Sequence, residues 1–200
     1  MCSREGTEAR LSVSANYVRV TKDDYDRFLV RPEIVGTFLL NDQDSPNGIG
    51  GYAEELSRQR RLLVLGSQWQ AVYYLLANEV GQETPPDSLP EPNEFARTGV
   101  LAKAVFGGRP VPAEEYNDVI WYLTPEEILE IARELDARTP EAVREDFESR
   151  EHGEVQIYHQ HPPSTWSGLD LDFLLSLYSH LRDFYLDASK EGNAVFVWLG

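Results

Sequence analysis

The chain has 200 residues, 42% of them hydrophobic and 11% aromatic, which is enough apolar side chain for the core of one domain. This composition excludes an intrinsically disordered protein, because disordered chains are poor in aromatic and apolar residues. The 34 acidic side chains outnumber the 18 basic ones and give a net charge of −16, which argues against binding to nucleic acid or to an anionic membrane surface. The single cysteine, Cys2, excludes a disulfide framework and a zinc site built from cysteines.

The sequence predicts a soluble, cytoplasmic protein. Its first ten residues carry four charged side chains and no apolar segment, so they do not form a secretion signal. No run of about 18 consecutive apolar residues occurs, so no membrane-spanning helix is predicted.

Residues 1–14 show no periodic pattern, and we interpret them as a flexible N-terminal extension to a single domain over residues 15–200. Tyr17-Val18-Arg19-Val20 alternates in the way that predicts a half-buried strand. Thr21 then precedes two acidic residues and an apolar i, i+3, i+4 spacing. This combination predicts a helix that ends near Pro32.

The middle of the chain is predicted to hold a helix, a long loop and a strand. After a loop over residues 41–51 and a short apolar run over residues 62–65, a one-sided apolar pattern predicts a helix over residues 68–80. Four prolines within residues 81–98 predict a surface loop inside the same domain. Residues 100–106 are mostly apolar and are closed by two glycines, which predicts a strand.

The clearest local signal is Thr124-Pro125-Glu126-Glu127, with a threonine N-cap, proline at the first helical position and glutamate three residues after the cap. It predicts a helix directly after a short strand at residues 121–123. The buried stripe of this helix is Ile128, Ile131, Ala132 and Leu135. Thr139-Pro140-Glu141 predicts a second, shorter helix by the same chemistry.

The apolar spacing after Asp170 predicts the longest helix of the chain, which Gly192 ends. The uncharged residues 194–198 then predict a last strand in the centre of a sheet. These elements indicate an α+β fold: a single domain with a small mixed sheet packed with several helices, and a long C-terminal helix followed by a final strand.

Several segments, in this order, carry a resemblance to a known family: Tyr17-Val18-Arg19-Val20, the helix around Trp69, Val105-Phe106-Gly107-Gly108, Tyr122-Leu123-Thr124-Pro125-Glu126-Glu127-Ile128, and Phe184-Tyr185 leading to Gly192-Asn193-Ala194-Val195. Over about residues 16–199 the chain resembles the YfbM-like family, a bacterial family designated a domain of unknown function. The resemblance implies one compact domain of helices and sheet. It implies no established activity, so it assigns no catalytic residue.

One position departs from that family. Relatives commonly have a Trp-His pair at the start of the middle helix, whereas this chain has Trp69-Gln70. Glutamine cannot titrate or act as a general base, so the departure favours a protein without catalytic activity.

Other motifs of catalysis or metal binding are weak. Gly48-Ile49-Gly50-Gly51 does not follow a strand, and no Lys-Ser or Lys-Thr pair comes after it, so we interpret it as a turn rather than a phosphate-binding loop. His159 and His161 lie close in sequence, but a zinc site needs three or four ligands, and an ordered loop explains the pair equally well. We therefore predict no catalytic residue, no metal site and no cofactor.

A ligand pocket, if the chain has one, would be built from aromatic side chains. Our candidates are Trp69, Gln70, Tyr73 and Tyr122, because Trp69 and Gln70 begin a helix whose first N–H groups are open to an acceptor. The competing interpretation is that these aromatic residues belong to the core, as most aromatic residues at helical or strand spacing do.

The acidic residues are concentrated, since residues 114–154 hold 14 acidic and 4 basic side chains. Glu126, Glu130 and Glu134 form an i, i+4 stripe opposite the buried one, and Arg133 and Arg138 are spaced to offset part of its repulsion. This stripe is either a solvated face that maintains solubility or a docking surface for a basic protein. We favour a non-catalytic, protein-binding module, for which an immunity-like role would suit. The alternative is a small-molecule-binding protein or enzyme with a pocket near Trp69 and Gln70.

Overall fold

The computed structural model describes residues 14–35, 56–76, 99–111, 120–150, 156–157, 164–165 and 170–199. Three predicted segments therefore lie outside the described residues, apart from Ser14: the N-terminal extension, the loop over residues 41–51 and the proline-rich loop over residues 81–98.

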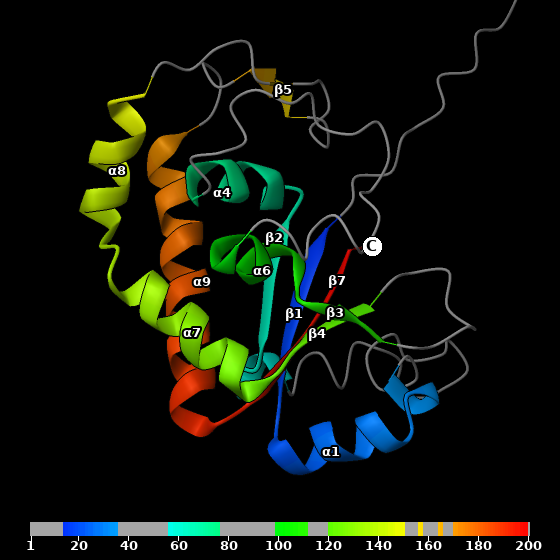
Figure 1. The fold of residues 1–200 in the computed structure, drawn as a ribbon. Helices are drawn as coiled ribbons and strands as arrows, with labels where there is room; N and C mark the ends of the chain where they lie inside the picture. Colours follow the sequence, from blue (N-terminus) through cyan, green and yellow to red (C-terminus); the bar gives the residue numbers. More distant parts are fainter. Residues whose placement is uncertain are drawn as a thin grey trace, which may run out of the picture.

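The centre of the protein is a five-stranded sheet with the order β2-β1-β7-β4-β3 (Figure 1). Its strands are β1 (Ala15–Val20), β2 (Leu62–Gly66), β3 (Arg109–Pro110), β4 (Ile120–Leu123) and β7 (Ala194–Leu199). The last strand, β7, lies in the middle, as its uncharged sequence predicts. A separate two-stranded ribbon pairs β5 (Gln156–Ile157) with β6 (Ser164–Thr165).

The helices are α1 (Lys22–Val30), α4 (Trp69–Leu76), α6 (Val100–Phe106), α7 (Pro125–Asp136), α8 (Pro140–Glu148) and α9 (Leu171–Glu191). The α+β class, the long C-terminal helix and the final strand agree with the sequence-based prediction. Thr21 caps α1, Thr139 caps α8 and Asp170 caps α9, each by accepting a backbone N–H in the first turn. Gly192, at φ +65°, ends α9 in the left-handed conformation.

The structure corrects the expected mixed sheet in its strand directions, because every pair of neighbouring strands that it describes is antiparallel. The path of the chain explains the pairing of β4 with β7. Helix α7 begins directly after β4 and α9 ends directly before β7, so the chain leaves the sheet and returns to it at the same end (Figure 1). Two neighbouring strands joined in this way must run in opposite directions.

The two faces of the sheet carry two separate hydrophobic clusters. Tyr17 and Val197 belong to the larger cluster, which includes the buried faces of α4, α6, α7, α8 and α9. Val18 and Phe196 are their neighbours along the strands, and they belong to the smaller cluster with Phe28 of α1. Alternate side chains of a strand point to opposite faces, so the sheet separates the two clusters.

The segment Val100–Phe106 is a helix, α6, so the prediction of a strand is wrong. Most of its side chains are buried, so the apolar residues show no one-sided pattern that would distinguish a helix from a central strand. Tertiary contacts select the helix. The hydroxyl of Tyr185 donates to the carbonyl of Ala104 and that of Tyr17 donates to the carbonyl of Val105, both at 2.8 Å. Buried tyrosines thus satisfy carbonyls that the end of a helix leaves unpaired.

Candidate functional site

The acidic face begins at the N-terminus of α7, where the capping box predicted from Thr124 is present. The hydroxyl of Thr124 accepts the N–H of Glu127 at 3.3 Å, and the carboxylate of Glu127 accepts the N–H of Thr124 at 3.1 Å. This geometry turns Glu127 inward, where it pairs with Lys103 at 3.1 Å and with Arg109 at 3.6 Å. Glu127 is therefore a structural residue and not part of the outer stripe.

The buried side chains of α7 determine which side of the helix faces solvent. Ile128, Ile131, Ala132 and Leu135 are at most 3% exposed, as the spacing predicts. Glu126, Glu130 and Glu134 consequently lie on the exposed side. A backbone hydrogen bond and the hydroxyl of Thr124 hold the pKa of Glu126 below its usual value, so this carboxylate is charged at neutral pH.

Two of these three carboxylates are not neutralised by the described residues around them. The predicted pairs of Glu130 with Arg133 and of Glu134 with Arg138 do not form, and neither glutamate makes an ion pair with any described residue. Leu129, 43% exposed, lies between Glu126 and Glu130 in the sequence and on the same exposed side. The outer side of α7 therefore presents an apolar side chain among free carboxylates.

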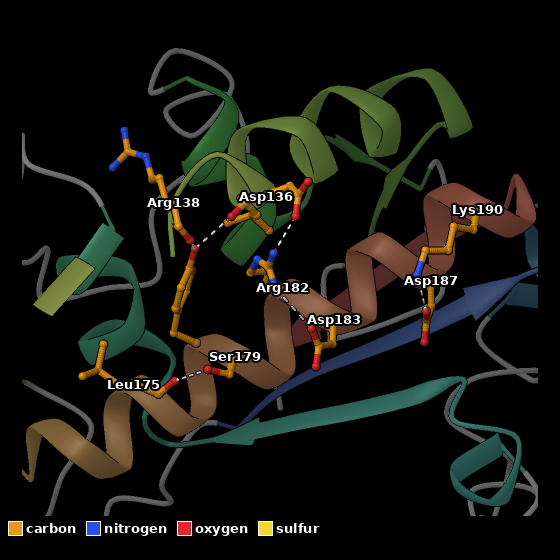
Figure 2. Close-up of polar contacts among 10 residues, drawn as sticks. Asp136, Arg138, Leu175, Ser179, Arg182, Asp183, Asp187 and Lys190 are labelled. Atoms are coloured by element: carbon orange, nitrogen blue, oxygen red, sulfur yellow. Dashed lines mark hydrogen bonds and ion pairs between the residues drawn. The ribbon is translucent and has the colours of Figure 1, made fainter. Parts of the chain in front are cut away.

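Carboxylates on the neighbouring elements are mostly paired. Arg182 of α9 bridges Asp136, at the end of α7, and Asp183 (Figure 2). Arg150 pairs with Asp146 of α8. Arg144 pairs with Glu148 of α8 and with Asp172 of α9. Among the described carboxylates of these elements, Glu141 and Glu145 of α8 are also exposed and without an ion pair to any described residue, whereas those of α9 are paired. We call Glu126, Glu130 and Glu134, with Leu129, the α7 acidic face.

The four residues predicted to line a ligand pocket do not come together. Trp69 is 2% exposed and packs edge-on against Phe106 with ring centroids 5.5 Å apart; Tyr73 contacts the same ring at 4.5 Å. These two residues belong to the larger cluster or pack against it, and Gln70 lies beside them in α4, half-buried. Tyr122 lies on the opposite face of the sheet, in the smaller cluster.

Tyr122 instead borders a shallow apolar hollow on the α1 side of the sheet. The hollow is lined by Phe28, Leu29, Pro32, Val35, Val111, Tyr122 and Phe196. Tyr122 is the polar residue of this lining; Arg109 is paired with it between β3 and β4, and the ring centroid of Tyr25 lies 6.0 Å from that of Tyr122. Burial raises the pKa of Tyr25, so its hydroxyl stays neutral at physiological pH.

Neither local periodicity nor motif spacing indicates this hollow. Its lining comes from α1, β4, β7 and the residues after α1 and β3, which only the strand order brings together. The alternation along β4 is the one signal that could have found it, because it places Tyr122 and Trp121 on opposite faces.

The described residues contain no group of three or more His, Cys, Asp or Glu side chains arranged to hold a metal ion. His159, His161 and Cys2 lie outside those residues. No described helix is both long and apolar enough to cross a membrane.

The geometry defines a single-domain α+β protein with an antiparallel sheet, one face of which carries most of the helices. A family model described as a domain of unknown function, DUF1877, matches residues 11–198, and the chain belongs to this family. Among solved structures it is similar to YfbM from Escherichia coli, titled a protein of unknown function. That similarity has 12% sequence identity and a TM-score of 0.51, and it covers 94% of this chain and 99% of that one, which supports the fold. No curated protein matches the chain.

Proposed function

We propose that this protein is a non-catalytic, protein-binding module that uses the α7 acidic face to dock a basic partner protein. The observation that carries the proposal is the contrast between this face and its surroundings. Glu130 and Glu134 are exposed and unpaired among the described residues, whereas Asp136, Asp146, Glu148 and the acids of α9 are paired.

The physical chemistry of such a face suits fast capture of a positively charged protein. Exposed charges of one sign raise association rates more than they slow dissociation, because their field acts before contact. Leu129, 43% exposed, offers an apolar contact among these charges. Neutralising a basic toxin in the cytoplasm, as an immunity protein does, is a role that fits this chemistry. Nucleic acid is a poor partner for the same surface, because phosphates carry the same sign of charge.

Affinity capture tests the proposal. The purified protein is immobilised and exposed to bacterial cell lysate at low and at high salt. A partner held by the α7 acidic face should be recovered at low salt, be lost at high salt, and carry a net positive charge.

Matched variants then locate the contact. The triple variant Glu126→Gln, Glu130→Gln, Glu134→Gln should fail to capture that partner. The control Asp23→Asn, Asp26→Asn, Glu33→Gln removes the same charge from exposed side chains on the α1 side of the sheet and should capture it normally. Equal capture by both variants would contradict docking on α7.

The hollow beside Tyr122 supports a second candidate function, the binding of a small apolar molecule. It combines an apolar lining with the side chain of Tyr122, and an apolar lining with few polar groups is the general character of a ligand site. Nuclear magnetic resonance titration with a library of small aromatic and aliphatic compounds tests it. Saturable shifts at Val35, Val111 and Phe196 are expected from a ligand, and shifts confined to other surfaces would reject this site.

A further inference from the structure

The outer edge of the sheet at β2 has features that the α7 acidic face does not explain. β2 pairs with β1 on one side and is the terminal strand of the described sheet. Exposed edge strands usually carry a charged residue, a proline or a bulge that prevents pairing with another chain. The five residues of β2, Leu-Leu-Val-Leu-Gly, contain no charged residue and no proline, and Val64 is 51% exposed. The pairing with β1 is regular from Leu62 to Val64, and the register shifts between Val64 and Gly66, so the regular part of the edge is Leu62 to Val64.

The register shows which backbone groups of β2 point outward. The N–H of Arg19 donates to the carbonyl of Arg61 at 2.8 Å, so these two residues form a hydrogen-bonded pair between β1 and the start of β2. Hydrogen-bonded and non-bonded pairs alternate along an antiparallel ladder. Leu62, opposite Val18, and Val64, opposite Asn16, are therefore non-bonded positions whose N–H and C=O groups face away from β1.

Two arginines lie at the N-terminal end of this edge. Arg60 is exposed and adopts φ +56°, held by a 2.7 Å hydrogen bond from Arg19 to its carbonyl. Arg61 donates through Nε to the carbonyl of Arg19 at 2.9 Å, and its Nη2 is buried, so its guanidinium is held against the sheet. A protein with a net charge of −16 thus places the exposed Arg60 beside a strand edge that no described strand pairs with.

We propose that the β2 edge binds an extended peptide segment of a partner protein, which adds a strand to the sheet and carries carboxylates at the end that meets Arg60. In the antiparallel orientation that the rest of this sheet uses, that end is the C-terminal end of the added strand. The backbone of the peptide pairs with Leu62 and Val64, and its apolar side chains cover Val64. Backbone pairing supplies affinity in this recognition mode, and Arg60 supplies direction and preference for acidic residues. The proposal is independent of docking on α7.

A synthetic peptide tests the proposal. The probe has alternating threonine and valine residues followed by three aspartates, and its control has the same sequence with alternate backbone nitrogens methylated. Amide hydrogen exchange should show rapid exchange at Leu62 and Val64 and protection at Leu63 in the free protein. Binding of the probe should slow exchange at Leu62 and Val64, and the methylated peptide should bind at least roughly tenfold more weakly because it lacks the pairing donors.

Two variants extend the test. Val64→Pro removes an N–H that the sheet does not use but the added strand needs, so it should abolish binding of the probe. Arg60→Glu should weaken the aspartate probe and strengthen one that ends in lysines, whereas Arg27→Glu, an equal charge change on α1, should leave both unchanged. If Val64→Pro does not fold, the comparison of the aspartate and lysine probes on Arg60→Glu still tests the proposal.

Three results would overturn the proposal. The first is binding of the methylated and unmethylated peptides with equal affinity. The second is unchanged exchange at Leu62 and Val64 when the probe is saturating. The third is a dimer in sedimentation of the protein alone with these two amides already protected, because a second copy would then occupy the edge. The glutamine triple variant of the α7 acidic face should bind the probe like the wild type, so the test of the β2 edge is independent of the test of docking on α7.

Discussion

Tyr178 shows how a single side chain connects two elements of the helical layer. It lies on α9, and its hydroxyl is within hydrogen-bond distance of the carbonyls of Leu135, at 3.1 Å, and Arg138, at 2.6 Å, at the C-terminal end of α7. The carbonyl of Leu135 also accepts the N–H of Arg138 at 3.2 Å, so the hydroxyl matters most for the carbonyl of Arg138.

We expect Tyr178→Phe to lower the free energy of unfolding by about 1–3 kcal/mol, because it leaves the carbonyl of Arg138 without a described donor. Urea denaturation measures the change. The control is Tyr25→Phe, which removes a hydroxyl with no hydrogen bond among the described residues and should cost much less. Equal losses in the two variants would show that the Tyr178 hydrogen bonds add no stability.

The same residue predicts a loss of stability at high pH. Burial raises the pKa of Tyr178 from 10.0 to about 12, and burial also raises the pKa of Tyr185 and of Tyr17. Because the unfolded chain releases these protons near pH 10, their contribution is complete below that pH and is lost as the pH rises toward 12. Urea midpoints measured between about pH 8 and 11 should fall, and less steeply in Tyr178→Phe. A flat profile in the wild type would contradict the burial of these hydroxyls.

At the scale of elements, the N-termini of three helices could be predicted from sequence, whereas the helical conformation of α6 could not. Thr21, Thr124 and Thr139 cap helices as their local spacing indicates, because a cap depends on residues within one turn. The identity of α6 depends instead on hydroxyls of Tyr17 and Tyr185, which are far away in the sequence. The placement of Tyr122 opposite Trp69 likewise depends on strand order, which no local pattern contains.

We expect Thr124→Ala to destabilise the protein by about 0.5–2 kcal/mol, because it removes the acceptor for the N–H of Glu127. The denaturation midpoint at constant slope measures this cost. Thr124→Ser, which keeps the acceptor, should stay close to the wild type. A serine variant as unstable as the alanine variant would show that the methyl group, not the cap, is responsible.

The turn after α6 requires a glycine for two reasons that a pair of variants can separate. Gly107 has φ +83°, and a Cβ atom there would lie 2.5 Å from the Cβ of Trp121. Gly99 has the similar φ of +90° with open space around it. Gly99→Ala should cost about 1 kcal/mol from backbone strain, and Gly107→Ala should cost clearly more because β4 must also move. Thermal or urea unfolding compares the two, and equal costs would contradict the close approach to Trp121.

At the scale of the whole molecule, the charge is unevenly compensated. Residues 114–154 hold 14 acidic and 4 basic side chains, and Arg144, Arg150 and Arg182 pair with acids on α8, on α9 and at the end of α7. The composition of this segment and the outward direction of Glu126, Glu130 and Glu134 could be predicted from sequence. The lack of ion pairs between Glu130 or Glu134 and any described residue could not, because arginines three or four residues away were spaced to reach them.

The association rate with a captured basic partner tests the central claim most directly. It is measured by stopped-flow across a salt series, for the wild type and for the variant Glu126→Gln, Glu130→Gln, Glu134→Gln. We predict that the variant associates more slowly, has a shallower salt dependence and dissociates at nearly the wild-type rate, because exposed charges act mainly through steering. Its unfolding midpoint should equal or slightly exceed that of the wild type, since like-charge repulsion along α7 is removed. Equal association rates and equal salt slopes in the two proteins would contradict the claim that the α7 acidic face is the docking surface.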